Sequence, residues 1–164
     1  KAKLDMLTAK AYMPTFYAAQ EGHAASMSIL VAARAIVHGD LQIAAQRGHV
    51  SVVQWLLETQ ALQKEFLEAA LTSADHGHTG VLRLLTAARA DVHVSRGSDG
   101  LTCLICAAYD GHAEVCKYLL ELKADTSPVA VANSSSNIME RDGTAFQFAS
   151  FFKHEKVMQL LNLI

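Results

Sequence analysis

The side chains with the clearest potential for chemistry in this 164-residue sequence are its eight histidines and three cysteines. Five histidines recur at one equivalent place in a repeated pattern: His23, His49, His78, His112 and His154. If each copy builds its own helix pair, neighbouring rings lie about 10 Å apart, one helix width. Zinc requires ligands within roughly 2.0–2.3 Å of one centre. We therefore expect turn histidines that bond local backbone, and we expect no bound metal and no cofactor.

The cysteines have the spacing of a reactive pair but lack its context. Cys103 and Cys106 match the C-x-x-C pattern of redox and zinc sites. No second cysteine pair completes a zinc site, and the segment is an expected helix start, so buried apolar cysteines are the favoured interpretation. Residues 97–100 lack the lysine of a phosphate-binding loop, and no nucleophile elbow is present. We expect the protein not to be an enzyme.

Composition excludes further classes of function. The formal net charge is −2, and the basic residues are scattered along the chain, which argues against a nucleic-acid ligand. A hydrophobic fraction of 51% with 18% charged residues predicts a folded chain. No apolar run approaches the roughly 18 residues that span a bilayer, so we expect no direct membrane insertion. The odd number of cysteines favours a reducing, intracellular location, in a compartment that the sequence does not identify.

The elements that position these side chains follow from the pattern around the histidines. A small-residue pair, two variable residues and Gly-His precede an apolar run that ends in Leu-Leu, as in Ala107-Ala108, Gly111-His112 and Leu119-Leu120. Apolar residues three and four apart predict a helix, and the glycine is suited to a left-handed helix end. Each copy therefore predicts helix, tight turn, helix and connector. The copies carry Gly22, Gly48, Gly77, Gly111 and, in the last, Lys153.

The helix ends and the fifth turn give more specific expectations. Asp40, Thr102 and Thr144 are placed to cap helix N-termini, and Pro14 suits a first helical turn. A left-handed Lys153 would be strained by roughly 1–2 kcal/mol, so this turn is either strained or rebuilt.

The copy at residues 99–125 resembles the ankyrin repeat almost position for position, and partial or degenerate matches occur at 14–35, 40–61, 68–93 and 142–161. The resemblance implies an all-α solenoid of about five helix-turn-helix repeats plus an N-terminal half repeat, with short or missing β-hairpin fingers. We expect one domain, 1–164, with a half repeat at 1–12, repeats at about 13–38, 39–63, 64–97, 98–126 and 142–164, and an inserted loop at 127–141.

Departures from the family pattern add two expectations. The histidine of the family's Thr-Pro-Leu-His element is replaced by Phe16, Gln42, Leu71, Ile105 and Gln147, so the hydrogen bonds it makes between repeats should be missing. Only segments near Val92–Asp99 and Met139–Gly143 are long enough to form fingers.

In this architecture the two residues before each turn glycine face the concave side and are candidates for binding a partner protein. For the polar members, ordinary solvated surface is an equally good interpretation. Arg96 and Asp99 of the longer connector join them. The candidates are Gln20, Glu21, Gln46, Arg47, Asp75, His76, Tyr109, Asp110, Phe151, Phe152, Arg96 and Asp99.

The expected function is a non-catalytic scaffold or adaptor for an unidentified protein. Two alternatives stay open. One is a structural subunit of a large assembly, whose neighbouring subunits cover the apolar ends. The other is a regulatory repeat segment of a longer enzyme.

Overall fold

The fold is a stack of helix pairs. The computed structural model describes residues 13–37, 39–59, 65–97, 99–131 and 142–162. These residues form ten α-helices and, apart from one isolated β-bridge, no paired strands. The expected half repeat at 1–12 lies outside the described residues. The helices are α1 (Pro14–Gln20), α2 (Ala24–Ala32), α3 (Asp40–Arg47), α4 (Val50–Thr59), α5 (Phe66–Asp75), α6 (Thr79–Ala87), α7 (Cys103–Tyr109), α8 (Ala113–Glu121), α9 (Ala145–Phe151) and α10 (Glu155–Leu161).

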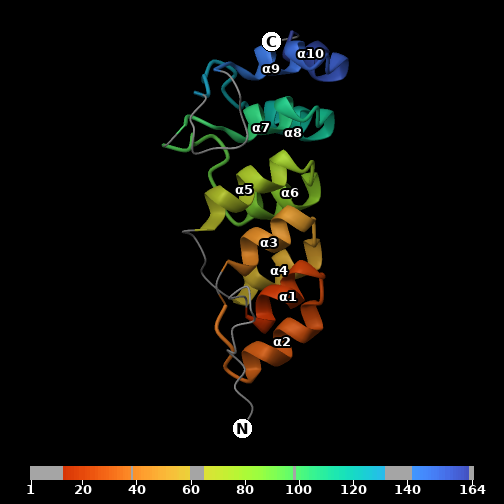
Figure 1. The fold of residues 1–164 in the computed structure, drawn as a ribbon, viewed down its shortest axis with the longest axis vertical. Helices are drawn as coiled ribbons and strands as arrows, with labels where there is room; N and C mark the ends of the chain where they lie inside the picture. The colour runs from red at the N-terminus through yellow and green to blue at the C-terminus, as the bar shows by residue number, and fades with distance from the viewer. Residues whose placement is uncertain (1–12, 38, 60–64, 98, 132–141, 163–164) are drawn as a thin grey trace.

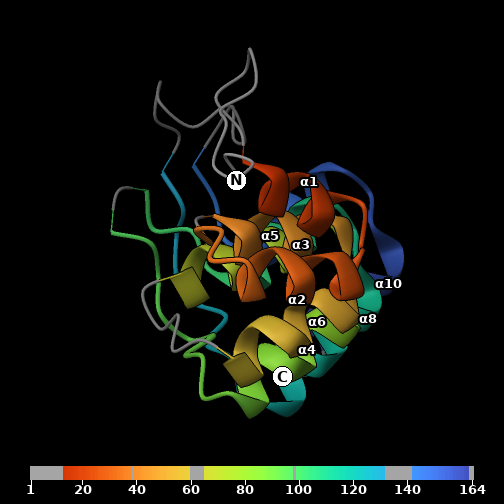
Figure 2. The same ribbon diagram turned by 90° about the horizontal axis from the view of Figure 1, so that it is seen from below.

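Successive pairs pile up along one axis, from α1 and α2 at one end to α9 and α10 at the other (Figure 1). The view along that axis shows the first helices in one row, the second helices in another, and the connectors projecting to one side (Figure 2). This arrangement confirms the expected all-helical solenoid.

One apolar core runs through the stack because each helix buries one face. The small pairs of the first helices, such as Ala44-Ala45 and Ala107-Ala108, are buried and let neighbouring first helices pack closely. The second helices bury Val and Leu three and four residues apart, as in Val81, Leu82 and Leu85, and they contact each other less. We call the more closely packed row of first helices the inner helix row.

Three of the predicted helix starts are confirmed. The hydroxyl of Thr102 accepts a hydrogen bond from the Ile105 amide at 3.2 Å. Thr144 and Gln147 form a reciprocal capping box, in which side chains satisfy two amides that the helix leaves free. Pro14 occupies the first helical turn, where its missing amide hydrogen costs nothing.

The expected cap at Asp40 is wrong. The N-cap of α3 is Gly39, in the left-handed region at φ 71°, and Asp40 is the first helical residue with a buried side chain. Counting back from the small pair of each repeat, Asp40 aligns with Cys103 and Gly39 with Thr102. The error is therefore one of register.

Left-handed glycines end the first helices, as predicted. Gly22, Gly48, Gly77 and Gly111 have φ between 73° and 78°. Lys153 keeps the same turn at φ 61°, so the alternative of a rebuilt fifth turn is wrong.

The turn histidines bind the preceding repeat, which corrects the expectation of local bonding. The Nε2 atoms of His49, His78, His112 and His154 lie 2.7–3.0 Å from the backbone oxygens of Gln20, Gln46, Asp75 and Tyr109, respectively. These oxygens lie in the last turn of each first helix, where no helical amide reaches them. Burial lowers the pKa of His78, which favours the neutral ring with Nε2–H as donor. Hydrogen bonds between repeats are therefore present, supplied by a different histidine from the one the family pattern lacks.

The histidine rings give a second reason, besides the left-handed backbone, why glycine occupies these turns. A Cβ on Gly22, Gly48, Gly77 or Gly111 would lie only 2.6–2.7 Å from Nδ1 of the next repeat's histidine.

The connectors form a small hydrogen-bonded edge. In the finger near Val92–Asp99, the Arg96 amide donates to the Leu101 oxygen and the Gly100 amide to the Arg96 oxygen, both at 2.8 Å. The Val131 amide reaches the Asp99 oxygen at 2.8 Å.

Part of the expected insertion joins this edge. Ala130 pairs with Gly143 through two bonds of 3.0 Å, and the bond from Val131 to Asp99 attaches the described start of the 127–141 loop to the finger. Residues 139–141 of the second expected finger lie outside the described residues.

We predict that Gly77→Ala lowers the free energy of unfolding by about 2–3 kcal/mol. The left-handed turn contributes roughly 1–2 kcal/mol, and displacement of the His112 ring costs a further hydrogen bond of about 1 kcal/mol. Urea unfolding followed by far-UV circular dichroism measures the change. The control is Gly97→Ala, because a Cβ there meets nothing within 4 Å. Equal effects of the two substitutions would contradict the ring contact.

We predict the opposite sign for Lys153→Gly. Glycine removes the left-handed strain, but its greater entropy in the unfolded chain offsets part of that gain. The free energy of unfolding should rise by up to about 1 kcal/mol, seen as a higher urea midpoint. A lower midpoint would show that the Lys153 side chain makes stabilising contacts that outweigh its backbone strain.

Candidate partner-binding surface

The candidate residues lie where the first helices end. In the first four copies the residue directly after the buried small pair is half-buried, and the one after it is exposed. Both members are exposed in the last copy. The half-buried residues are Gln20, Gln46, Asp75 and Tyr109, and the exposed ones are Glu21, Arg47, His76, Asp110, Phe151 and Phe152.

His76 links two neighbouring repeats. Its Nδ1 lies 3.0 Å from the Thr72 backbone oxygen, and its Nε2 lies 3.4 Å from the Gln46 amide nitrogen. A neutral ring with the proton on Nδ1 satisfies both contacts, because Nδ1 then donates and Nε2 accepts. His76 also stacks on His78 at a centroid distance of 6.3 Å.

Asp75 and Asp110 bring like charges together across the α5–α7 contact. Burial raises the pKa of Asp75, the charge of Asp110 raises it further, and His76 and His112 oppose these effects. Asp75 Oδ1 is closed off from solvent, and no described residue donates a hydrogen bond to it. A hydrogen bond between the two carboxyl groups also raises the pKa of Asp75, because it requires one of them to keep its proton.

Three other candidates, Tyr109, Phe151 and Phe152, form an aromatic patch together with Phe148 at the C-terminal end of the stack. Tyr109 lies 5.5 Å from Phe148 and 4.7 Å from Phe152, and Phe151 lies 4.9 Å from Phe152, all edge to face. Phe148 is buried, whereas Phe151 is 53% and Phe152 40% exposed. The buried ring thus supports two rings that face solvent.

Arg96 and Asp99 form an ion pair within the finger, which also reaches α5. The Arg96 guanidinium contacts both carboxylate oxygens of Asp99, and its Nη1 lies 3.5 Å from Glu68 Oε2. The hydrogen bonds from Arg96 lower the pKa of Asp99, which is itself buried. The pair therefore ties the finger to the inner helix row.

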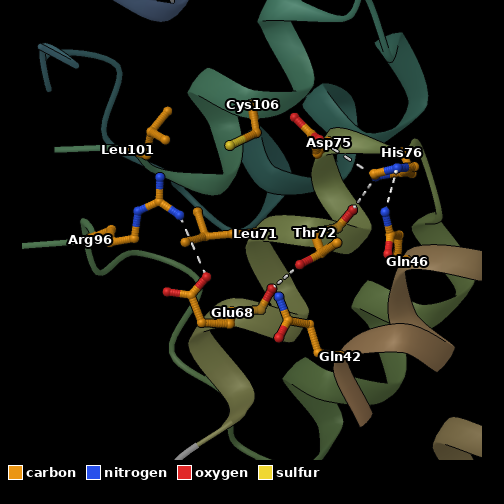
Figure 3. Close-up of a pocket in the computed structure, with 10 residues that line it drawn as sticks. All are labelled: Gln42, Gln46, Glu68, Leu71, Thr72, Asp75, His76, Arg96, Leu101 and Cys106. Atoms are coloured by element: carbon orange, nitrogen blue, oxygen red, sulfur yellow. Dashed lines mark hydrogen bonds and ion pairs between the residues drawn. The ribbon is translucent and has the colours of Figure 1, made fainter. Parts of the chain in front are cut away.

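Between the finger and helices α3, α5 and α7 lies a pocket of about 200 Å³. Arg96 and Leu101 border one side, Asp75 and His76 the other, and Leu71 lies between them (Figure 3). The full lining is Gln42, Gln46, Glu68, Leu71, Thr72, Asp75, His76, Arg96, Leu101 and Cys106.

Most residues of this pocket were not among the predicted candidates. Glu68, Leu71, Thr72 and Asp75 are spaced at i, i+3, i+4 and i+7, which places them on one helix face. That spacing was a usable signal, although the position of the finger was not. Seven candidates divide between two surfaces, the pocket and the aromatic patch. The other five line neither: Gln20, Glu21, Arg47, Asp99 and Asp110.

The cysteines have the character expected of buried apolar residues. Cys103, Cys106 and Cys116 are all buried. Burial raises the pKa of Cys103 and of Cys116 to about 12, and it raises that of Cys106 as well. The thiols are protonated at neutral pH and are poor nucleophiles and poor metal ligands.

A search of the described residues for histidine, cysteine and acidic side chains grouped closely enough to hold a metal finds no cluster of three or more. Within the same residues, every helix is too short or too polar to cross a bilayer.

Comparison with known families places the repeats in an established class. A family model of ankyrin repeats, with three copies, matches residues 67–162, more than half of the chain.

We predict that Asp75→Asn stabilises the protein at pH 7, by less than about 1 kcal/mol because the carboxyl is still partly solvated. The folded-state pKa of Asp75 is raised, so the fold loses stability as the pH rises through that pKa. The advantage of the variant should therefore grow between pH 3.5 and pH 7 in urea unfolding. Glu114→Gln, on the exposed outer surface of α8, is the charge-matched control. An advantage that does not depend on pH would contradict the electrostatic cause.

Proposed function

Because this chain belongs to the ankyrin repeat family, whose repeats are generally protein–protein interaction modules, we propose that it is a non-catalytic adaptor or scaffold. In this proposal it binds another protein, and not nucleic acid, through the inner helix row and the finger. The carrying observation is the aromatic patch, where Phe151 and Phe152 face solvent beside Tyr109.

The energetics of association support this assignment. Aromatic rings are enriched in protein interfaces, and a few of them often contribute most of the binding free energy. Phe151 and Phe152 are held by edge-to-face contacts, so binding freezes little additional side-chain motion. The protonated, buried thiols support the non-catalytic part of the proposal.

A second candidate function is that of a subunit whose end repeats are covered by neighbours. It is supported by the distribution of large exposed apolar side chains, many of which lie in the first and last helix pairs. These include Tyr17, Ile29, Phe146, Phe151 and Phe152.

Size-exclusion chromatography with light scattering separates the two candidates. A free adaptor elutes as a monomer over a wide concentration range, whereas a subunit lacking its neighbours self-associates through the uncovered ends. Self-association would favour the second candidate over the first.

We predict that Phe151→Ser with Phe152→Ser abolishes partner capture from a native lysate while leaving helical content unchanged. Both rings are exposed, so their loss removes contact area without opening the core. Quantitative mass spectrometry of captured proteins is the measurement. Ile29→Ser with Val50→Ser, two exposed apolar residues of the second helices, is the matched control. Capture retained by the phenylalanine variant would reject the aromatic patch as the binding surface.

A further inference from the structure

The turn at Lys153 has the same backbone geometry as the four glycine turns before it. Lys153 is left-handed at φ 61°, and the His154 amide donates to the Ala149 oxygen at 2.8 Å. The equivalent histidine amides of the other four turns reach their acceptors at 2.8–2.9 Å. The Cβ of Lys153 therefore points in the direction that a Cβ would take from each of the four glycines.

That direction leads to the place where a histidine ring is seated at the other turns. A Cβ on any of the four glycines would lie 2.6–2.7 Å from Nδ1 of the next repeat's histidine. The ring cannot simply move aside, because its Nε2 is held 2.7–3.0 Å from a backbone oxygen. Since Lys153 already has a Cβ there, a further turn histidine cannot seat on it as His154 seats on Gly111.

A left-handed backbone alone does not select glycine in this chain. The ends of three second helices are left-handed at φ 62–67° and carry exposed long basic side chains, those of Arg34, Arg89 and Lys123. The four turn glycines differ from these positions because a Cβ on them would meet a histidine ring. Glycine thus marks the turns on which another repeat is seated, and Lys153 lacks that mark.

A repeat seated on α9 and α10 would cover part of the aromatic patch. At the preceding junction, Tyr109 lies 4.7 Å from Phe152 of the next repeat, and Phe151 holds the place of Tyr109 in the fifth copy. The other end of the stack carries His23, the turn histidine of the first copy, which is exposed (Figure 1). A second copy of this chain therefore has the group that such seating requires.

We propose that Lys153 is a specificity-determining residue that excludes end-to-end stacking of this chain. Its Cβ keeps His23 of a second copy from seating on α9 and α10. The proposal rests on the adaptor function only in what the exclusion protects, because an end kept clear of other copies leaves Phe151 and Phe152 to a different protein. The steric part rests on the geometry of the four glycine turns alone.

Two substitutions that differ by one carbon atom test the exclusion in the full chain. Lys153→Ala removes the charge and the stem but keeps the Cβ, whereas Lys153→Gly removes the Cβ as well. We expect Lys153→Gly to self-associate at least about tenfold more tightly than Lys153→Ala, because the clash is lost and a hydrogen bond is gained. The contact joins unlike ends, so sedimentation velocity should show open oligomers that grow with concentration.

His23→Ala in the Lys153→Gly background is the matched control for the surface that associates. It should return the self-association to the level of Lys153→Ala. Equal association of the glycine and alanine variants would overturn the proposal, and so would an increase that survives His23→Ala. Far-UV circular dichroism checks the fold, and loss of helical content in either Lys153 variant would contradict the equivalence of the five turns.

The outcome is separable from that of the proposed function. Self-association specific to Lys153→Gly, together with capture retained by the Phe151 and Phe152 variant, would keep the exclusion and reject the patch. Capture lost by that variant, together with equal association of the glycine and alanine variants, would reject the exclusion alone.

Discussion

The contact between each turn histidine and the preceding repeat is the constraint on which the rest of this structure depends. Each imidazole binds a backbone oxygen in the last turn of the preceding repeat's first helix. Its ring also lies against the turn glycine of that preceding repeat. One residue therefore supplies both a hydrogen bond and a close steric contact between neighbouring helix pairs. The glycine of the Gly-His dipeptide recurs for two reasons that act together. The backbone there is left-handed, and the histidine ring leaves no room for a Cβ.

This constraint also shapes the binding surface. The oxygens of Gln46, Asp75 and Tyr109 are held by the next repeat, so the backbone of the candidate residues is fixed while their side chains stay free to differ. In a solenoid, each repeat contacts only its neighbours, so such side chains vary without consequences for distant repeats. A surface preorganised in this way loses little conformational entropy when a partner binds.

The sequence predicts the parts of the fold that are local and repeated. The small pairs, the Gly-His dipeptides and the Leu-Leu runs lie within one helix pair, and they correctly predict helix, turn and helix. The histidine bonds were mispredicted because their acceptors lie 29–45 residues away and belong to another repeat. The pocket was missed for a related reason: Arg96 meets Glu68 only after the finger folds back over α5. The capping error at Asp40 has a simpler cause, one residue of register.

The last turn of α7 shows how one helix end can serve two surfaces. Tyr109 occupies the first candidate position and packs toward Phe148 and Phe152 of the following repeat. Asp110 occupies the second position and faces Asp75 of the preceding repeat. The two carboxyl groups come from different positions in consecutive repeats. Their contact therefore cannot be predicted from the pattern of a single repeat. Since the carboxylates repel each other and the rings attract, α7 places a destabilising element beside a stabilising one. Proton uptake relieves that repulsion, because the charge of Asp110 and the hydrogen bond between the two carboxyl groups both raise the pKa of Asp75.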